Sequence, residues 1–142
     1  MSKFQDCLEK GLLKKIEKST KFSTQDLKQA EFFLNEAYDL INLKKKEMAL
    51  IALYNAVFHA GRAILFNDGF GERSHYCLEK YLEENYLGKG FEARDLSLFD
   101  ILRETRQEVQ YDTVRVEIEH DLNELFEGAE QFIQKNKKIV GK

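Results

Sequence analysis

The sequence predicts an all-α fold: an antiparallel up-and-down helical bundle of four core helices with one or two additional helices. Proline is absent from all 142 residues and 33% of them are charged, a composition that favours long uninterrupted helices. Apolar residues recur at the spacing of a helix face, and no segment shows the convincing period of two typical of a strand. The chain, residues 1–142, is expected to form a single domain.

The stretch from Leu50 to Phe66 has the clearest helical pattern and is expected to be the central, most buried helix. Seventeen residues form a rod about 25 Å long, the height of a small bundle. Its apolar face consists of Leu53, Ala56, Val57, Ala60 and Ile64. A second, polar line of Asn55, His59 and Arg62 runs beside that face, and it is the first indication of a functional site.

The remaining helices are assigned from the same spacing and from capping residues. They are a short helix from Phe4 to Ile16, a helix from Ser23 or Thr24 to about Leu43, one from Ser74 to about Gly88, one from about Phe91 to Tyr111, and a last one that begins at Asp112 or Thr113 and frays in the tail KNKKIVGK.

Composition excludes several classes of protein. The net charge of −3 does not support a broad basic surface, so duplex DNA is not an expected partner. The N-terminus lacks an apolar signal core, and no uncharged apolar run is long enough to predict a membrane span. Cys7 and Cys77 match no metal-binding spacing and are too few for a disulfide framework. We therefore expect a soluble cytoplasmic protein with reduced thiols.

Three segments together resemble one known family. LYNAVFHAGRAILF resembles the "YYAxFHAARALL" helix of the HEPN domain (higher eukaryotes and prokaryotes nucleotide-binding), and RSHYCL resembles the "THxGL" segment that follows it. RQEVQYD resembles the "RxxADY" stretch of a prokaryotic branch, and the resemblance covers about residues 26–134. It implies an antiparallel bundle, commonly a homodimer, that often pairs with a minimal nucleotidyltransferase in toxin–antitoxin or related modules.

Many members of that family are RNases, in which an Arg is followed four to six residues later by a His. Here Arg106 is followed at that distance by Tyr111. A phenol with an ordinary pKa near 10 is only about 0.1% ionised at pH 7, so it is a poor general base. On a straight helix, Arg106 and Tyr111 would also point about 140° apart, and Gln110 is the nearer neighbour of Arg106. We therefore expect binding in preference to cleavage.

The proposed ligand-binding residues are those that the resemblance and the polar line bring forward. In this hypothesis arginines hold phosphate oxygens, histidines donate hydrogen bonds, and the tyrosine stacks on a base. The set is His59, Arg62, His75, Arg106 and Tyr111, with no catalytic residue, metal or cofactor assigned.

Each of these residues also has an ordinary structural interpretation. His59 would hydrogen-bond a neighbouring helix, and Arg62 would pair with Glu104 or Glu108. His75 would face solvent from a loop, although a position at a helix start also favours anions. Arg106 would form a surface ion pair.

The favoured function is a module that binds a nucleotide or single-stranded RNA as the partner of a nucleotidyltransferase. The first alternative is an active endoribonuclease that takes its base from His59, His75 or His120. The second is a di-metal carboxylate bundle built on the two E-x-x-H motifs, Glu72 to His75 and Glu117 to His120. A third is a pure interaction module whose surface includes Phe70, Tyr76, Tyr86 and Phe91, which would otherwise be ordinary core or rim aromatics.

Overall fold

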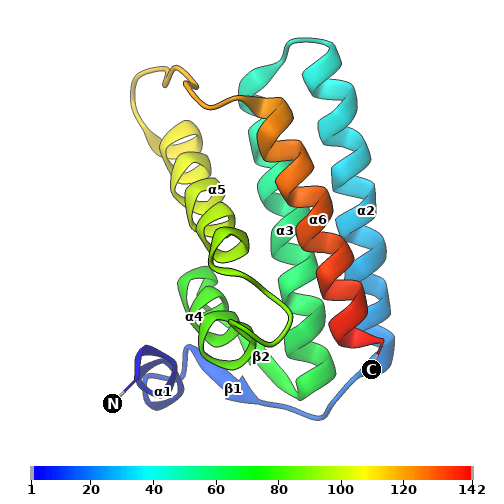
Figure 1. Ribbon diagram of the computed structural model, residues 1–142. Helices are drawn as coiled ribbons and strands as arrows, with labels where there is room; N and C mark the ends of the chain where they lie inside the picture. Colours follow the sequence, from blue (N-terminus) through cyan, green and yellow to red (C-terminus); the bar gives the residue numbers. More distant parts are fainter. Residues whose placement is uncertain (1, 142) are drawn as a thin grey trace.

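The computed structural model describes residues 2–141, which form six helices and one small two-stranded sheet (Figure 1). The elements in chain order are α1 (Lys3–Glu9), β1 (Leu13–Lys15), α2 (Thr20–Asn42), α3 (Lys46–Asp68), β2 (Phe70–Glu72), α4 (His75–Tyr86), α5 (Ala93–Tyr111) and α6 (Leu122–Val140).

The four long helices α2, α3, α5 and α6 run alternately up and down in Figure 1, which confirms the predicted all-α antiparallel bundle. α3 packs against the other three, with α2 and α6 as its closest partners. Thirteen of its residues, from Ala49 to Leu65, are buried. By length and composition α3 could cross a membrane, but 72% of its apolar window is buried inside the bundle, as in the core helix of a soluble protein.

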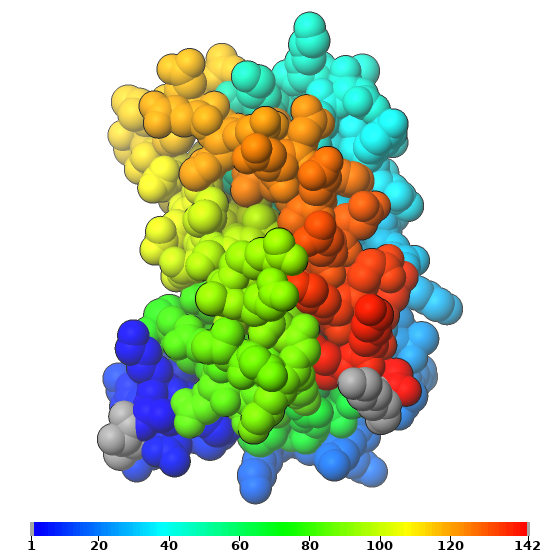
Figure 2. All heavy atoms as spheres, viewed as in Figure 1, coloured from blue at the N-terminus to red at the C-terminus, as the bar shows by residue number. Residues whose placement is uncertain are grey.

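Small residues on α3 let the neighbouring helices approach closely. A Cβ atom added at Gly61 would lie 3.0 Å from Leu78 Cδ2 and 3.1 Å from Leu82 Cδ1, so α4 sits directly against this glycine. At the other end of α4, the turn to α5 lies against α6 in Figure 2, and a Cβ atom at Gly90 would come within 2.7 Å of Ile139. These contacts fix α4, and with it His75, against the central helix.

Two predicted helix starts are wrong. α2 begins after Ser19, whose hydroxyl accepts a hydrogen bond from the Phe22 amide, whereas Ser23 is buried inside the helix and donates to the Ala63 carbonyl at 2.8 Å. The last helix starts after Asp121, which caps the amides of its first turn, and residues 112–121 form an irregular connection. The tail that was expected to fray is helical to Val140.

The N-terminal region also departs from the prediction. α1 ends at Glu9, and β1 follows within the segment expected to be helical as far as Ile16. β1 pairs antiparallel with β2, Leu13 opposite Glu72 and Lys15 opposite Phe70. Each strand has three residues, which is too short for a period of two to be visible in the sequence.

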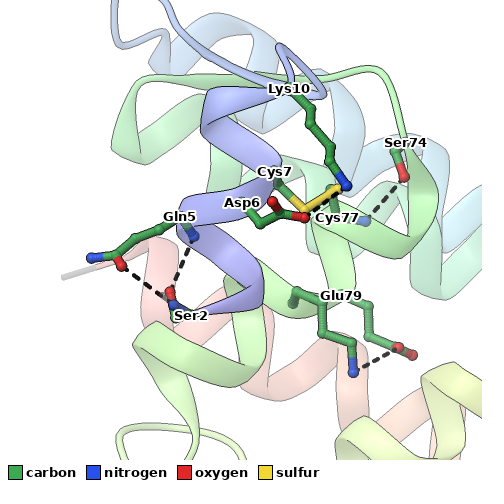
Figure 3. Close-up of a disulfide and its surroundings, with 9 residues drawn as sticks. Ser2, Gln5, Asp6, Cys7, Lys10, Ser74, Cys77 and Glu79 are labelled. Carbon is green, nitrogen blue, oxygen red and sulfur yellow. Dashed lines mark hydrogen bonds and ion pairs between the residues drawn. A yellow bond between two sulfur atoms is a disulfide. The ribbon is translucent and has the colours of Figure 1, made fainter.

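The prediction of reduced thiols is contradicted by a disulfide between Cys7 and Cys77 (Figure 3). Their Cα atoms are 5.9 Å apart, although the two residues are separated by 70 positions in the sequence. The pairing depends on α1 packing against α4, which the count and spacing of cysteines do not reveal. The bond ties the N-terminal α1 to the helix that begins with His75.

We predict that the double variant Cys7→Ser, Cys77→Ser unfolds at a lower urea concentration than the oxidised protein. A cross-link between residues that are 70 positions apart lowers the conformational entropy of the unfolded chain. In the chain-entropy model this raises the free energy of the unfolded state by about 4 kcal/mol. Reduction of the native protein should lower the midpoint in the same direction. Unchanged midpoints in both cases would show that this disulfide does not stabilise the fold.

Candidate functional site

The polar line on α3 is held by one buried carboxylate from α2. Asp26 is 4% exposed and accepts three hydrogen bonds: one from His59 Nδ1 and two from the Arg62 guanidinium, each 2.9 Å long. The His59 ring also stacks on Phe33. His59 therefore bonds a neighbouring helix, which was its ordinary structural interpretation, while the partner expected for Arg62 was wrong, since that partner is Asp26.

The ionisation of this cluster follows from its contacts. Burial raises the pKa of Asp26, but the hydrogen bonds from His59 and Arg62 outweigh burial and leave that pKa below its ordinary value. The hydrogen bond to Asp26 raises the pKa of Arg62. Glu72 lies 3.8 Å from the Arg62 guanidinium, and burial raises the pKa of this second carboxyl. The charge of Arg62 is thus engaged within the protein.

A second polar system joins α3 to the start of α4. The fully buried Tyr54 places its hydroxyl 2.6 Å from His75 Nδ1, and Phe58 stacks on the His75 ring at 4.2 Å. Ser74 caps α4 by accepting from the Cys77 amide, which fixes the backbone beside His75. Ser74 was the cap that the sequence predicted for this helix.

The hydrogen bond to Tyr54 defines the protonation of His75. Burial raises the pKa of Tyr54, so its hydroxyl keeps its proton, and His75 Nδ1 is the acceptor within reach. If Nδ1 carried a proton instead, the buried Tyr54 proton would have no acceptor among the described residues, which is costly. We therefore assign the neutral tautomer with the proton on Nε2, a nitrogen without a protein partner in residues 2–141.

His75 is also surrounded by positive charge. Burial lowers its pKa below the ordinary value, and the cations Arg106, Arg62 and Arg103 lower it further. Near neutral pH the ring is thus an uncharged donor through Nε2, next to fixed positive charges that attract an anion.

Arg106 on α5 is the cation of this group that the rest of the protein engages least. Its guanidinium lies over the Tyr54 ring, with Cζ 4.6 Å from the ring centroid, and donates to Gln110 at 2.9 Å. Its Nε is buried without a hydrogen-bond partner. Within residues 2–141 no carboxylate oxygen lies within 4.0 Å of it, so the expected surface ion pair does not form. Arg103, one turn earlier, is instead bound to Asp100.

The structure brings four of the five predicted site residues together and leaves one apart. The Phe58 ring contacts His59, Arg62 and His75, and the Tyr54 ring contacts His75 and Arg106. Tyr111 is the last residue of α5 and is 69% exposed, and within residues 2–141 its side chain forms no hydrogen bond or ring contact with the other four. Its role in ligand binding stays a prediction without a supporting contact.

The metal alternative loses its structural basis, whereas the interaction-surface alternative loses one of its four aromatics and stays a prediction. Glu117 to His120 lies in the irregular connection before α6, so the helical i, i+3 geometry of an E-x-x-H metal motif does not apply. Among residues 2–141 no group of three or more His, Cys, Asp or Glu side chains is arranged to hold a metal ion. Of the aromatics proposed as an interaction surface, Phe91 is buried and stacks on Phe132 in the core, while Tyr76 is 40% exposed.

Sequence reasoning missed Tyr54 and Asp26, the two residues that position the site. Tyr54 lies among apolar neighbours on α3 and was counted as packing, although a buried tyrosine usually finds a hydrogen-bond partner. Asp26 would lie in the first turn of a helix that starts at Ser23 or Thr24, whereas α2 starts four or five residues earlier. The signal for its burial is its helical spacing, four and eleven residues, from the buried Ala30 and Ala37.

Fold and site together define an all-α bundle whose central helix carries a cationic cluster shared with α4 and α5. A comparison with known families matches residues 24–140 to the HEPN domain, so the chain belongs to the HEPN family, whose members bind nucleotides or RNA and in some cases cleave RNA. A search of curated proteins finds no matching relative. α1 and β1 precede the matched region.

We predict that Asp26→Asn destabilises the protein by about 3 kcal/mol at pH 7, because Arg62 then loses the buried carboxylate that accepts two of its hydrogen bonds. The pKa of Asp26 is below its unfolded value of 3.8, so its stabilisation is present above that value and is lost as the pH falls through the folded pKa. Urea unfolding from pH 7 to pH 3 should therefore show the difference between the two proteins shrinking in acid. A difference that stays constant would contradict this assignment.

Proposed function

We propose that this HEPN domain binds a nucleotide or single-stranded RNA through a phosphate group at Arg106 and His75, and that it does not cleave RNA. The observation that carries the proposal is the half-buried Arg106 guanidinium, which has no carboxylate partner among residues 2–141 and lies over the ring of Tyr54, the residue whose hydroxyl hydrogen-bonds His75. Cationic groups left uncompensated by the protein are suited to a ligand that brings its own negative charge.

In this proposal two hydrogen-bond donors, Arg106 and His75, bind the phosphate group. A guanidinium has five N–H groups; Gln110 takes one from Arg106 and the Nε–H is buried, so the remaining N–H groups of the two terminal nitrogens are left for phosphate oxygens. The Tyr54 ring beneath Arg106 keeps water from one face and holds the group in place. His75 contributes a neutral N–H. Arg62 adds little to this attraction, since its direct hydrogen bonds go to Asp26, which compensates its charge.

A second candidate, an endoribonuclease, is favoured by one observation. Tyr54 contacts both His75 and Arg106, and the pKa of His75 is lowered, so His75 is a spatial substitute for the histidine that the sequence motif lacks. A general base needs an unprotonated Nε2, whereas the hydrogen bond from Tyr54 favours the proton on that nitrogen. The tautomer of His75 therefore distinguishes the two functions: a proton on Nε2 favours binding, and an unprotonated Nε2 is required for catalysis. His120 is exposed in the connection before α6 and His59 is bonded to Asp26, so neither matches His75 as a base.

We further propose that the protein forms a homodimer and works with a minimal nucleotidyltransferase in a toxin–antitoxin-like pair. Membership of the HEPN family supports both proposals, because such assemblies are common in it. Sedimentation at tens of micromolar tests the dimer, and a monomer would exclude it. Co-purification with a nucleotidyltransferase encoded next to this chain tests the partner, and its absence from that neighbourhood would exclude the pairing.

We predict that Arg106→Gln weakens the binding of a short single-stranded RNA at least tenfold, measured by fluorescence anisotropy. A charged hydrogen bond contributes about 1.5 to 3 kcal/mol, which corresponds to a loss of this size. Arg94→Gln is the matched control, since it removes an exposed arginine from the first turn of the same helix. Equal affinities in the native protein and both variants would contradict the proposed site.

The same samples test cleavage when the RNA is analysed by gel electrophoresis. We expect the RNA to remain intact with the native protein near pH 7, and Tyr111→Phe to change neither binding nor this result. RNA cleavage that disappears in a His59, His75, His120 triple alanine variant would establish the endoribonuclease instead. Melting curves of each variant confirm that it is folded.

A further inference from the structure

A pocket of about 250 Å³ lies between α4 and α5, outside the phosphate site described above. Its polar lining includes three carboxylates, Glu79, Glu83 and Asp100, and its apolar wall consists of Leu87, Ala93 and Leu96. A small cavity that combines clustered carboxylates with a hydrocarbon wall is suited to a ligand with a cationic head and an aliphatic chain.

Glu79 supplies the observation that points to a ligand. It is 2% exposed, and its Oε1 atom is buried with no hydrogen-bond partner. Its Oε2 atom is 3.8 Å from Lys80 Nζ, which is too far for a hydrogen bond. Figure 3 draws the Glu79 carboxylate pointing away from the disulfide that anchors the same helix. A buried carboxylate oxygen without a hydrogen-bond partner costs free energy unless another group or a proton compensates its charge.

The charges around the pocket do not balance. Lys80 donates to Glu83 at 3.2 Å, and Arg103 donates to Asp100 at 2.8 Å, so each of these cations has a carboxylate of its own. Glu79 is the third carboxylate, and its one ion pair, at 3.8 Å, is with Lys80, the cation that already donates to Glu83. Next to these cations but outside the pocket lining are Tyr76, whose ring lies beside both of them, and Glu104, which is 3.9 Å from Arg103.

Without a ligand, the protein reduces the excess negative charge in the pocket by keeping a proton on Glu79. Burial, the charge of Asp100 and a hydrogen bond with Asp100 raise the pKa of Glu79 to about 7, so the carboxyl is largely protonated below neutral pH and donates this proton to Asp100. A cation bound in the pocket would provide the missing charge and would drive this proton into solvent.

We propose that the pocket binds the ammonium group of an aliphatic primary amine, with Glu79 as the acceptor and the Leu87, Ala93 and Leu96 wall against the methylene chain. The ammonium keeps its three protons, and the proton lost from Glu79 passes to the buffer. An organic cation fits better than a metal ion, because the described residues offer no group of three ligands with suitable geometry. The site is independent of Arg106.

The test is calorimetric titration of the oxidised native protein with n-butylamine at pH 6, in two buffers that differ in ionisation enthalpy. An aliphatic amine stays protonated at this pH, so the released proton comes from the protein. We expect saturable binding with most of a proton released per amine, and affinity that increases as the pH is raised towards 8. Glu79→Gln should bind at least tenfold more weakly and release no proton.

Glu84→Gln is the matched control, because it removes an exposed carboxylate from the same helix outside the pocket, and it should behave as the native protein does. Arg106→Gln should also bind butylamine normally, which separates this site from the phosphate site. Absence of saturable binding by the native protein, or equal binding and proton release by Glu79→Gln, would overturn the proposal. The melting midpoint of Glu79→Gln should not fall, because the variant removes a buried charge.

Discussion

The candidate site depends on one hydrogen bond, between the Tyr54 hydroxyl and His75 Nδ1. Tyr54 is fully buried on the central helix, so its position is set by the packing of the core. Its hydroxyl orients His75 at the start of α4, and its ring supports Arg106 on α5. A single buried side chain therefore fixes two groups that come from different helices, and it also selects which nitrogen of His75 carries the proton.

The central helix supports two polar systems with different consequences. At Asp26, carboxylate and guanidinium satisfy each other, and the result is mainly a stabilising link between α2 and α3. At Tyr54, a neutral phenol and a neutral imidazole satisfy each other while the adjacent Arg106 keeps its charge uncompensated. An anion is therefore expected to bind at Arg106, whose positive charge has no carboxylate partner among residues 2–141. Arg62, whose charge Asp26 compensates, instead stabilises the packing of α2 on α3.

The sequence predicted the bundle well because its long helices carry strong periodicity, above all from Leu50 to Phe66. It failed where structure depends on contacts between distant segments: the Cys7–Cys77 bond, the three-residue strands, and the early start of α2. The family resemblance led to His59, Arg62, His75 and Arg106, which lie together. Tyr111 was chosen only by its position in a motif, and helix geometry places it away from Arg106. The supporting Tyr54 could not be separated from ordinary core aromatics without knowing what its hydroxyl contacts.

The most direct measurement of the central claim is the side-chain ¹⁵N spectrum of His75 as a function of pH. The account predicts a neutral ring with its proton on Nε2 near pH 7, and a titration midpoint below 6.5, since burial and the nearby arginines lower the pKa of His75. Tyr54→Phe should abolish the preference for that tautomer. A neutral ring with its proton on Nδ1, or a titration midpoint at the ordinary value, would contradict the account and would leave Nε2 available as a general base.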